Sequence, residues 1–299
     1  MRKTKRFTPN VLSRFEKQGR GEGTYGDFFP WHCVTRGDPS SLGRSHLLMW
    51  HGRLRELLSD GELGTQLFAT MLPDIDDCLE QLDLDTEDGP HVLVRYQDHD
   101  PLRLYPGTVQ LAKQLGIKHP IVRDRSEQAL WRPTTDLLLI RRNGAGKRFA
   151  QAIAFKPDDC AQSRRKRELL SLEREFWTVR AVQWLLITPK LSDPRVVLTL
   201  RRIGAWALAE PAAQDAKRTV IDLAYELPGR TVTRVLEQAT SILGSMDLAQ
   251  RALWQSVWFG ELPIDLRRGW RPQEPLRFFS SEIFAQQNPI ALGRSSWTS

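Results

Sequence analysis

Two short apolar runs separated by a glycine-rich turn form the clearest pattern in the chain. The first run, residues 135–140, contains Asp136 near its start, and the second, residues 149–155, ends just before Lys156. Residues 143–146, with the sequence Asn-Gly-Ala-Gly, are typical of a tight turn, so the pattern predicts a β-hairpin. Because strand side chains alternate between faces, Asp136 and Lys156 are expected close together at one rim of the sheet.

Helical periodicity frames this hairpin on both sides. Residues 59–71 have the spacing of a capped helix that begins at Ser59, and residues 109–116 predict a short helix closed by a glycine. A longer helix is expected from Arg164, and the apolar run 184–188 is typical of a buried parallel strand. Hairpin, helix and parallel strand in this order predict an α/β fold. The apolar stripe of the long helix is expected to comprise Leu169, Leu172, Phe176 and Val179, with Glu173 beside it.

Residues 190–194 are the predicted boundary to a second domain. Beyond them the pattern is mostly helical, with amphipathic helices expected over residues 233–243 and 247–258 and a short strand over residues 261–266. Helices followed by a short strand favour a small winged-helix domain. The sequence therefore predicts a catalytic domain over residues 1–190, a winged-helix-like domain over 191–271 and a C-terminal tail over 272–299. Within the first domain, residues 91–96 are predicted to form a further strand.

Composition and charge narrow the function without deciding it. The 299 residues are 40% hydrophobic and include ten tryptophans, which indicates a folded chain with a sizeable core. The formal net charge is +7 and the isoelectric point is near 9.5, so a polyanion is a plausible partner. Charge alone is equally compatible with an acidic protein partner.

Cysteine usage and the apolar runs indicate a cytoplasmic protein. Cys33, Cys78 and Cys160 are far apart and form no C-x-x-C pair, so neither a zinc knuckle nor a disulfide framework is expected. Residues 1–6 are basic and have no apolar run behind them, which does not resemble a secretory signal. No stretch approaches the ~18 apolar residues of a membrane span. A reducing cytoplasm fits these features best.

The hairpin rim suggests a hydrolytic site on DNA. An acid such as Asp136 can hold a divalent metal, and Lys156 can balance the negative charge on a phosphate under attack. The alternative is that both charges merely shield a sheet rim from edge-to-edge pairing. Glu62 has the same ambiguity, because it lies three residues after Ser59 and can serve as a capping-box residue or as a metal ligand.

Two basic segments are candidates for phosphate contacts. Residues 19–26 are glycine-rich and lack apolar periodicity, so they predict a loop whose Arg20 reaches a phosphate backbone or that is simply a lead-in. Residues 164–167 open the long helix with four consecutive basic side chains, which either contact phosphates or form a solvated helix start.

Six short motifs occur in a fixed order between about residue 14 and residue 188. They are Gly19-Arg20-Gly21-x-Gly23 with Pro30-Trp31, Ser40-Ser41 with Gly43-Arg44-Ser45-His46, Leu57-Leu58-Ser59-Asp60-x-Glu62-Leu63, Gly116-Ile117-Lys118-His119-Pro120, Thr135-Asp136, and Lys156-Pro157. In this order they resemble the TnsA endonuclease family. Its members cut the 5′ strands at the ends of Tn-seven-type transposons as one subunit of a heteromeric transposase. Beyond residue 190 only the layout is similar.

The resemblance implies a restriction-endonuclease-like mixed sheet flanked by helices, with a magnesium site that manganese can also occupy. It assigns the metal to Glu62 and Asp136 and the catalytic ammonium to Lys156. Glu173 matches a further family glutamate of less defined role. At the position two residues before the lysine, where the family leads one to expect glutamine, this chain has Ala154. The backbone carbonyl of Phe155, with waters, is the expected replacement ligand.

The resemblance also implies partners. These are double-stranded DNA at transposon ends, a TnsB-like subunit that cuts the 3′ strands, and a TnsC-like ATPase that contacts the C-terminal region, all acting at the bacterial nucleoid. Two rivals stay open: a stand-alone restriction or repair nuclease, and a DNA-binding assembly subunit whose site has decayed. The candidate DNA contacts are Arg20, Arg44, Lys118, His119, Arg164 and Arg165.

Overall fold

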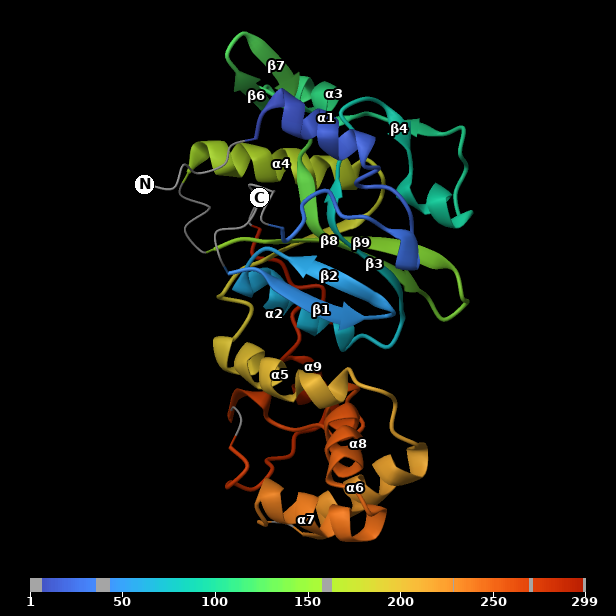
Figure 1. The fold of residues 1–299 in the computed structure, drawn as a ribbon, viewed down its shortest axis with the longest axis vertical. Helices are drawn as coiled ribbons and strands as arrows, with labels where there is room; N and C mark the ends of the chain where they lie inside the picture. The colour runs from blue at the N-terminus through green and yellow to red at the C-terminus, as the bar shows by residue number, and fades with distance from the viewer. Residues whose placement is uncertain (1–6, 36–43, 158–162, 228, 269–270, 298–299) are drawn as a thin grey trace. The chain divides into compact units, whose positions relative to one another are not determined.

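The computed structural model describes residues 7–35, 44–157, 163–227, 229–268 and 271–297. Motif residues Ser40, Ser41 and Gly43, and also Cys160, lie outside this part of the chain. The chain divides into two compact units (Figure 1). The first comprises Met1–Leu63, Asp74–Thr188 and Ser296–Ser299, and the second comprises Gly64–Pro73 and Pro189–Ser295.

A mixed four-stranded sheet organises the first unit. Its strands are β3 (Ile75–Asp83), β8 (Thr134–Arg142), β9 (Arg148–Phe155) and β10 (Gln183–Ile187), in the order β10-β9-β8-β3. β8 pairs antiparallel with both β3 and β9, whereas β9 and β10 are parallel. The predicted hairpin and the predicted parallel strand are therefore confirmed, as is a mixed sheet flanked by helices.

Helices α3 (Thr108–Gln114) and α4 (Arg164–Thr178) pack together, and α4 also packs against β10. Both helices contribute to one apolar core with the sheet strands. The Ser163 hydroxyl caps α4 by accepting a hydrogen bond from the Lys166 amide. The predicted stripe is only partly right. Leu172 and Phe176 are buried as expected, Leu169 and Val179 are half-buried, and Leu170 and Trp177 are buried although the pattern did not select them.

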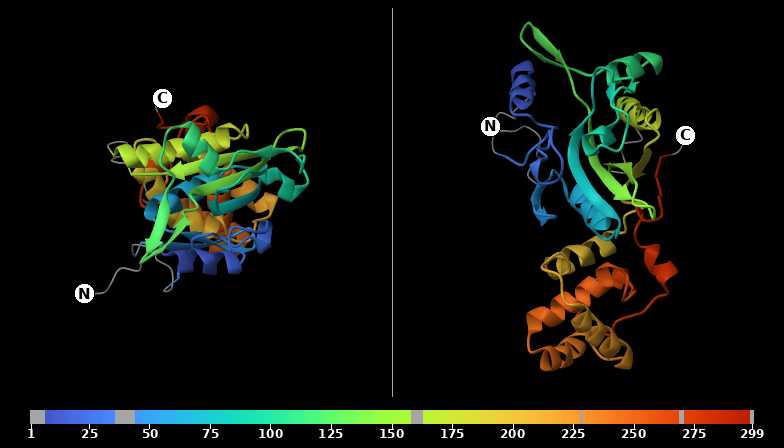
Figure 2. Two further views of the ribbon diagram at one scale, coloured as in Figure 1. Left: turned by 90° about the horizontal axis from the view of Figure 1, so that it is seen from above. Right: turned by 90° about the vertical axis from the view of Figure 1, so that its right-hand side faces the viewer.

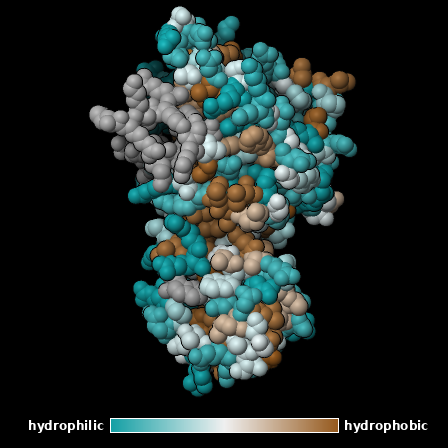
Figure 3. Space-filling model, in the orientation of Figure 1, coloured by the Kyte–Doolittle hydropathy of each residue, from teal (hydrophilic) through white to brown (hydrophobic). Residues whose placement is uncertain are grey.

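A second, two-stranded sheet precedes the strands of the mixed sheet along the chain. It comprises β1 (His46–Trp50) and β2 (Arg53–Leu57), and helix α2 (Asp60–Thr70) follows it as predicted. One face of this hairpin exposes Leu47, Met49 and Leu54, and Figure 3 shows hydrophobic side chains gathered over these strands. The opposite face holds Arg55 in the interior.

The N-terminal segment is more structured than its glycines suggested. Pro9–Lys17 forms helix α1 and Tyr25–Asp27 a 3₁₀ turn, η1. Helix α1 lies beside a small hairpin of β6 (Ile121–Asp124) and β7 (Glu127–Leu130), as Figure 2 shows. A separate small core of Leu12, Phe15, Trp31 and Val122 fixes this arrangement.

The predicted strand over residues 91–96 is wrong. Val92–Tyr96 form a 3₁₀ helix, η2, between the short strands β4 (Gly89–Pro90) and β5 (Leu104–Tyr105). The His91 ring explains the difference, because its Nδ1 accepts a hydrogen bond from the Leu93 amide at 3.1 Å and caps the turn. A capping side chain of this kind competes with strand pairing.

Helices dominate the second unit. These are α5 (Pro194–Ala207), α6 (Gln214–Glu226), α7 (Val232–Leu243), α8 (Met246–Trp258) and the short α9 (Ser281–Ala285), and α8 packs against α5, α6 and α7. The two amphipathic helices predicted here, α7 and α8, are confirmed.

The strand predicted over residues 261–266 is not formed. Within this stretch Ile264 alone makes an isolated bridge, to Phe278, and a short 3₁₀ turn, η4 (Leu266–Arg268), begins at Leu266. Pro263 has no amide hydrogen, and the Leu266 amide donates to the Gln287 side chain instead of a neighbouring strand. The winged-helix assignment therefore stays a prediction.

The last described residues return to the first unit. The Ser296 amide donates to the Leu186 carbonyl at 2.8 Å, and the Trp297 ring packs edge-on against Trp184 with a centroid distance of 5.6 Å. Part of the predicted tail is thus bound to strand β10. No helix within the described residues is both long enough and apolar enough to cross a membrane.

Gly61, in the first turn of α2, is expected to be intolerant of a side chain. A Cβ at this position would overlap the ring of Phe155, so Gly61→Ala should force α2 away from the end of β9. We expect a loss of about 1–3 kcal/mol in the free energy of unfolding, measured by urea denaturation. Gly144→Ala is the matched control, because a methyl group there meets open space. Equal stability of the two variants would contradict the close packing of α2 on β9.

Candidate active site

The rim of the sheet brings Asp136 and Lys156 into direct contact. The Lys156 ammonium donates to Asp136 Oδ2 at 2.6 Å, and the Phe155 amide donates to the same oxygen at 2.7 Å. The Lys156 amide in turn donates to the Ile187 carbonyl of β10 at 3.0 Å, which fixes the lysine backbone. The predicted proximity of Asp136 and Lys156 is confirmed, while their catalytic roles stay predictions.

Glu62 reaches the same region from the first turn of α2. Its Oε2 accepts hydrogen bonds from the Leu58 amide at 2.8 Å and from Gln81 Nε2 at 3.0 Å, and its Oε1 accepts one from the Ser59 hydroxyl at 3.0 Å. The Glu62 amide donates back to Ser59 Oγ at 3.2 Å. The Ser59 hydroxyl thus caps the Glu62 amide as in a capping box, but the Glu62 carboxylate accepts from the Leu58 amide and not from the Ser59 amide. The same carboxylate extends into the buried site.

The electrostatics show that Glu62, Asp136 and Lys156 act on one another. Burial, followed by the negative charge of Asp136, raises the pKa of Glu62 to about 7, although Lys156 opposes the shift. Burial also works to lower the pKa of Lys156, but Asp136, Glu173 and Glu62 outweigh it, so its pKa is raised. The lysine therefore remains an ammonium ion at neutral pH.

Glu173 is the fourth ionisable group of the cluster. It projects from α4, and its Oε1 accepts hydrogen bonds from the Thr135 hydroxyl at 3.0 Å and from the Trp184 indole at 3.2 Å. Burial raises the pKa of Glu173 to about 7, with Lys156 opposing the shift and Asp136 adding to it. Glu173 is thus held by neutral donors beside a charged pair.

A cavity of about 310 Å³ opens beside the Asp136–Lys156 pair. Its wall combines the charged groups of the cluster with apolar surface, which suits a polar ligand that has an apolar body. The lining residues are Trp131, Pro133, Thr134, Asp136, Lys156, Lys166, Leu169, Leu170 and Glu173.

The donor set fits a hard divalent cation. Glu62 and Asp136 offer carboxylate oxygens, and Asp136 Oδ1 receives no hydrogen bond from the described residues. Across those residues, no three His, Cys, Asp or Glu side chains are placed to hold a metal ion together. A cation here would therefore need backbone or water oxygens as well, which Mg²⁺ tolerates. Ala154 is fully buried and supplies no ligand, whereas the Phe155 backbone adjoins Asp136.

Comparison with known proteins finds similarity over the part of the chain that contains Asp136, Lys156 and Glu173. A model of the TnsA-like endonuclease N-terminal domain matches residues 93–189, which include Asp136, Lys156 and Glu173. The transposon Tn7 transposition protein TnsA of Escherichia coli is 33% identical over 192 residues, which are 64% of this chain. The matched part covers 60% of that relative and so spans less than two thirds of its length.

Residues 93–189 are therefore similar to the N-terminal domain of TnsA-like endonucleases and are called the TnsA-like domain below. The resemblance to the TnsA endonuclease family is thereby confirmed. Within this domain Asp136 lies on β8, Lys156 directly follows β9, and Glu173 lies on α4. Glu62 lies outside the matched residues, but its carboxylate is close enough to Asp136 and Lys156 to interact with their charges.

Arg20, one of the predicted DNA contacts, lies inside the fold. Arg20 is buried, and its guanidinium donates to the Trp31 carbonyl at 3.1 Å and to Gln18 Oε1 at 2.8 Å. It also lies over the Phe15 ring, with 3.8 Å between the guanidinium carbon and the ring centroid. These contacts anchor the glycine-rich segment internally and leave Arg20 little surface for a phosphate.

The other basic candidates remain accessible to different degrees. Arg44 and Lys118 are exposed, and Arg44 forms an outer ion pair with Asp60 at 3.4 Å. The His119 ring is half-buried, and it contacts the Thr108 hydroxyl and the Pro120 carbonyl, each at 3.0 Å. Because a carbonyl can only accept, Nδ1 of His119 donates to it. Burial lowers the pKa of His119, which favours a neutral ring whose Nε2 accepts from the Thr108 hydroxyl.

The basic start of α4 is partly neutralised. Arg164 and Arg165 both pair with Glu168, at 3.0 and 3.1 Å, although the Arg164 side chain is 95% exposed. These residues can rearrange toward a phosphate because exposed pairs are weak. Their role in DNA binding stays a prediction.

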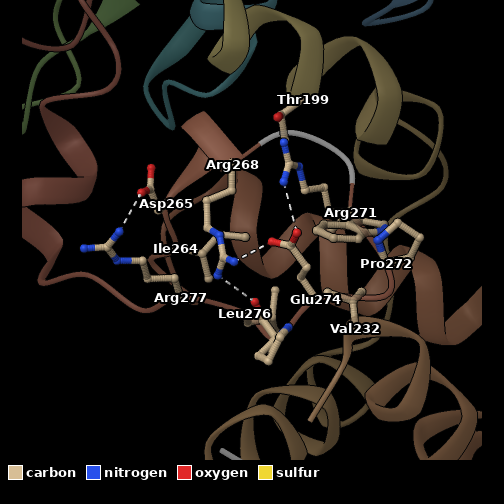
Figure 4. A pocket seen from close by; sticks show the side chains of 12 residues that line it. Thr199, Val232, Ile264, Asp265, Arg268, Arg271, Pro272, Glu274, Leu276 and Arg277 are labelled. Atoms are coloured by element: carbon tan, nitrogen blue, oxygen red, sulfur yellow. Dashed lines mark hydrogen bonds and ion pairs between the residues drawn. The ribbon is translucent and has the colours of Figure 1, made fainter. Parts of the chain in front are cut away.

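The second unit contains a separate hollow of about 40 Å³ (Figure 4). It is rich in arginine, but the arginines are already matched by acids. Arg268 and Arg271 both pair with Glu274, and Arg277 lies 3.8 Å from Asp265. Each of these arginines already has an acidic partner, so the hollow is a weaker candidate for chemistry than the region of Asp136 and Lys156.

The raised pKa of Glu173 predicts a pH-dependent stability. Its pKa is about 7 in the folded chain against an ordinary 4.5, so its stabilising effect is complete below about pH 4.5 and is lost as the pH rises through 7. Glu173→Gln keeps Oε1 as the acceptor of both hydrogen bonds and removes the charge. At pH 8, without metal, the free energy of unfolding of the variant should equal that of the unchanged protein or exceed it by about 1–3 kcal/mol.

Chemical denaturation at pH 5 and pH 8 measures this effect. Glu168→Gln on the same helix is the control, because that carboxylate forms surface ion pairs with Arg164 and Arg165. If Glu173→Gln and the control show the same change in stability between the two pH values, the buried-charge account of Glu173 is wrong.

Proposed function

We propose that this chain is the DNA-cutting subunit of a Tn7-like transposase, a metal-dependent endonuclease that hydrolyses the 5′ strands at transposon ends. The observation that carries the proposal is the contact of Lys156 with Asp136 beside Glu62 and Glu173, inside a TnsA-like endonuclease domain. A lysine held next to clustered carboxylates at a strand end suits phosphodiester hydrolysis.

Each side chain has a defined task in this proposal. Glu62 and Asp136 would hold Mg²⁺ or Mn²⁺, assisted by the Phe155 carbonyl. The bound ion would acidify a water and stabilise the leaving 3′-oxygen. Lys156 stays charged because Asp136 and the two glutamates surround it, so it can neutralise the phosphate in the transition state. Glu173 keeps Lys156 oriented from the opposite element, α4.

The remaining parts of the proposal concern partners and domains. We propose that residues 1–190 form the catalytic domain, residues 191–271 a winged-helix-like domain and residues 272–299 a tail. A TnsB-like subunit would bind the transposon ends and cut the 3′ strands, and a TnsC-like ATPase would contact the C-terminal region. The relative from Escherichia coli is named as a Tn7 transposition protein, which supports this assembly.

One observation favours a second candidate, a subunit whose nuclease site has decayed. Ala154 contributes no ligand at the strand position that faces the same side as Lys156. Against it stands the retained group of Glu62, Asp136, Lys156 and Glu173, because a decayed site has no reason to keep charges buried.

Asp136→Asn is expected to abolish cleavage while preserving the fold. An asparagine oxygen can still accept the hydrogen bonds from Lys156 and the Phe155 amide, which both reach one oxygen of Asp136. The variant loses the negative charge, so we expect 5′-strand cleavage to fall by at least about 100-fold. The assay reconstitutes end cleavage with the partner subunits and Mg²⁺, and a gel shift reports assembly on the DNA.

Asp98→Asn is the matched control, since Asp98 also forms an ion pair, with Arg148 at 3.0 Å. The control should cut normally. Cleavage by Asp136→Asn at the unchanged rate would exclude this site as the nuclease centre. Loss of assembly in the same variant would assign Asp136 a structural role, and cutting of naked DNA by the chain alone would favour a stand-alone nuclease.

A further inference from the structure

Gln81 lies in the middle of the cluster, although nothing in its local sequence marks it. Strand β3 pairs with β8 through Glu80–Leu137 on one side and Leu82–Thr135 on the other, which places Gln81 opposite Asp136. The Gln81 side chain is 2% exposed. An amide is therefore buried on the strand beside the carboxylate that binds Lys156.

The amide of Gln81 is directed at Glu62. Gln81 Nε2 donates to Glu62 Oε2 at 3.0 Å, the same oxygen that accepts from the Leu58 amide at 2.8 Å. The other end of the amide, Oε1, accepts a long hydrogen bond from the Thr134 hydroxyl at 3.5 Å. Because a carboxylate only accepts, this pattern fixes which end of the amide faces Glu62.

The backbone at Gln81 is held in an unusual conformation. Its φ is +51°, in the left-handed region that non-glycine residues rarely adopt inside a strand. The Gln81 carbonyl accepts a hydrogen bond from the Trp31 amide at 3.1 Å, so a separate segment secures the distortion. Strained backbone that surrounding contacts maintain is concentrated at functional sites.

No side chain on β9 could perform the same task. The position two residues before Lys156 is Ala154, which has no polar side-chain atom and is fully buried. By contrast, another buried glutamine of the sheet, Gln151, binds Arg141 at 2.9 Å and Gln183 at 2.7 Å and has no contact with the cluster carboxylates. Gln81 thus differs from Gln151 because its side-chain amide binds a carboxylate of the cluster, Glu62.

We propose that Gln81 is a positioning residue, which holds the Glu62 carboxylate in the orientation that lets Glu62 and Asp136 bind one divalent cation. The inference rests on the proposed function, because it assumes that this pair of carboxylates is the cation site. It adds a residue from β3 to a cluster that otherwise comes from α2, the β8–β9 hairpin and α4. Groups that orient metal ligands commonly change metal affinity by about 10–100-fold when they are removed.

Mn²⁺ binding to the full chain without DNA tests the inference. Isothermal titration calorimetry compares the unchanged protein with Gln81→Met, which keeps the side-chain length and removes the amide. We expect the Kd for Mn²⁺ to weaken by at least about 10-fold. Gln151→Met removes an equally buried amide from the same sheet and should leave the Kd unchanged, which separates positioning from a general loss of stability.

A second variant guards against misfolding. Gln81→Asn shortens the amide by one methylene group, so the donor no longer reaches Glu62, and asparagine tolerates a positive φ better than most residues. It should weaken Mn²⁺ binding in the same direction. Unchanged affinity in either folded variant overturns the role of Gln81.

The same experiment distinguishes a failure of the positioning role of Gln81 from a failure of the proposed cation site. If the unchanged protein binds Mn²⁺ and Asp136→Asn does not, but Gln81→Met binds normally, the positioning role fails and the proposed function stands. If the unchanged protein binds no Mn²⁺, the proposed cation site and the inference fail together.

Discussion

Three buried carboxylates share a single ammonium group at the end of the β8–β9 hairpin, and the proposed chemistry depends on this imbalance of charge. Lys156 binds Asp136 directly, while Glu62 and Glu173 approach from α2 and α4. Burial raises the pKa of both glutamates to about 7, so the fold holds acids that resist ionisation. Burying several acids together does not stabilise the fold. Side chains with strongly shifted pKa values are concentrated at functional sites. A divalent cation would supply the missing positive charge.

The fold positions these groups by short, local devices. At the end of β9 the Phe155 amide donates a hydrogen bond to Asp136. The amide of the next residue, Lys156, donates to the Ile187 carbonyl of β10. The Ser59 hydroxyl caps the first turn of α2, which contains Glu62, and the close approach of Gly61 to Phe155 brings that turn against the end of β9. Asp136 and Glu62 thus lie near element ends, where backbone amides orient their carboxylates, whereas side chains hold Glu173 within α4.

The sequence predicted the parts of the site that depend on local periodicity. Asp136 and Lys156 belong to one hairpin, so alternation alone was enough to bring them together. The capping role of Glu62 was equally local, but its approach to Asp136 depends on packing between α2 and β9, and only the family resemblance indicated it. Gln81 gave no signal, because its role comes from a distorted strand position and a partner 19 residues away.

Two segments differ from what their local composition suggests, for the same physical reason. Residues 91–96 have strand-like composition, yet the His91 cap turns them into a 3₁₀ helix, and Arg20 is basic yet buried against Phe15 and Trp31. In both cases a tertiary or capping contact overrides the local preference.

Anomalous diffraction from crystals soaked in Mn²⁺ tests the central claim most directly. The account predicts one anomalous peak in contact with carboxylate oxygens of both Glu62 and Asp136, beside the Lys156 ammonium. A peak elsewhere in the TnsA-like domain, or none at these carboxylates when Mn²⁺ is in excess, would contradict it.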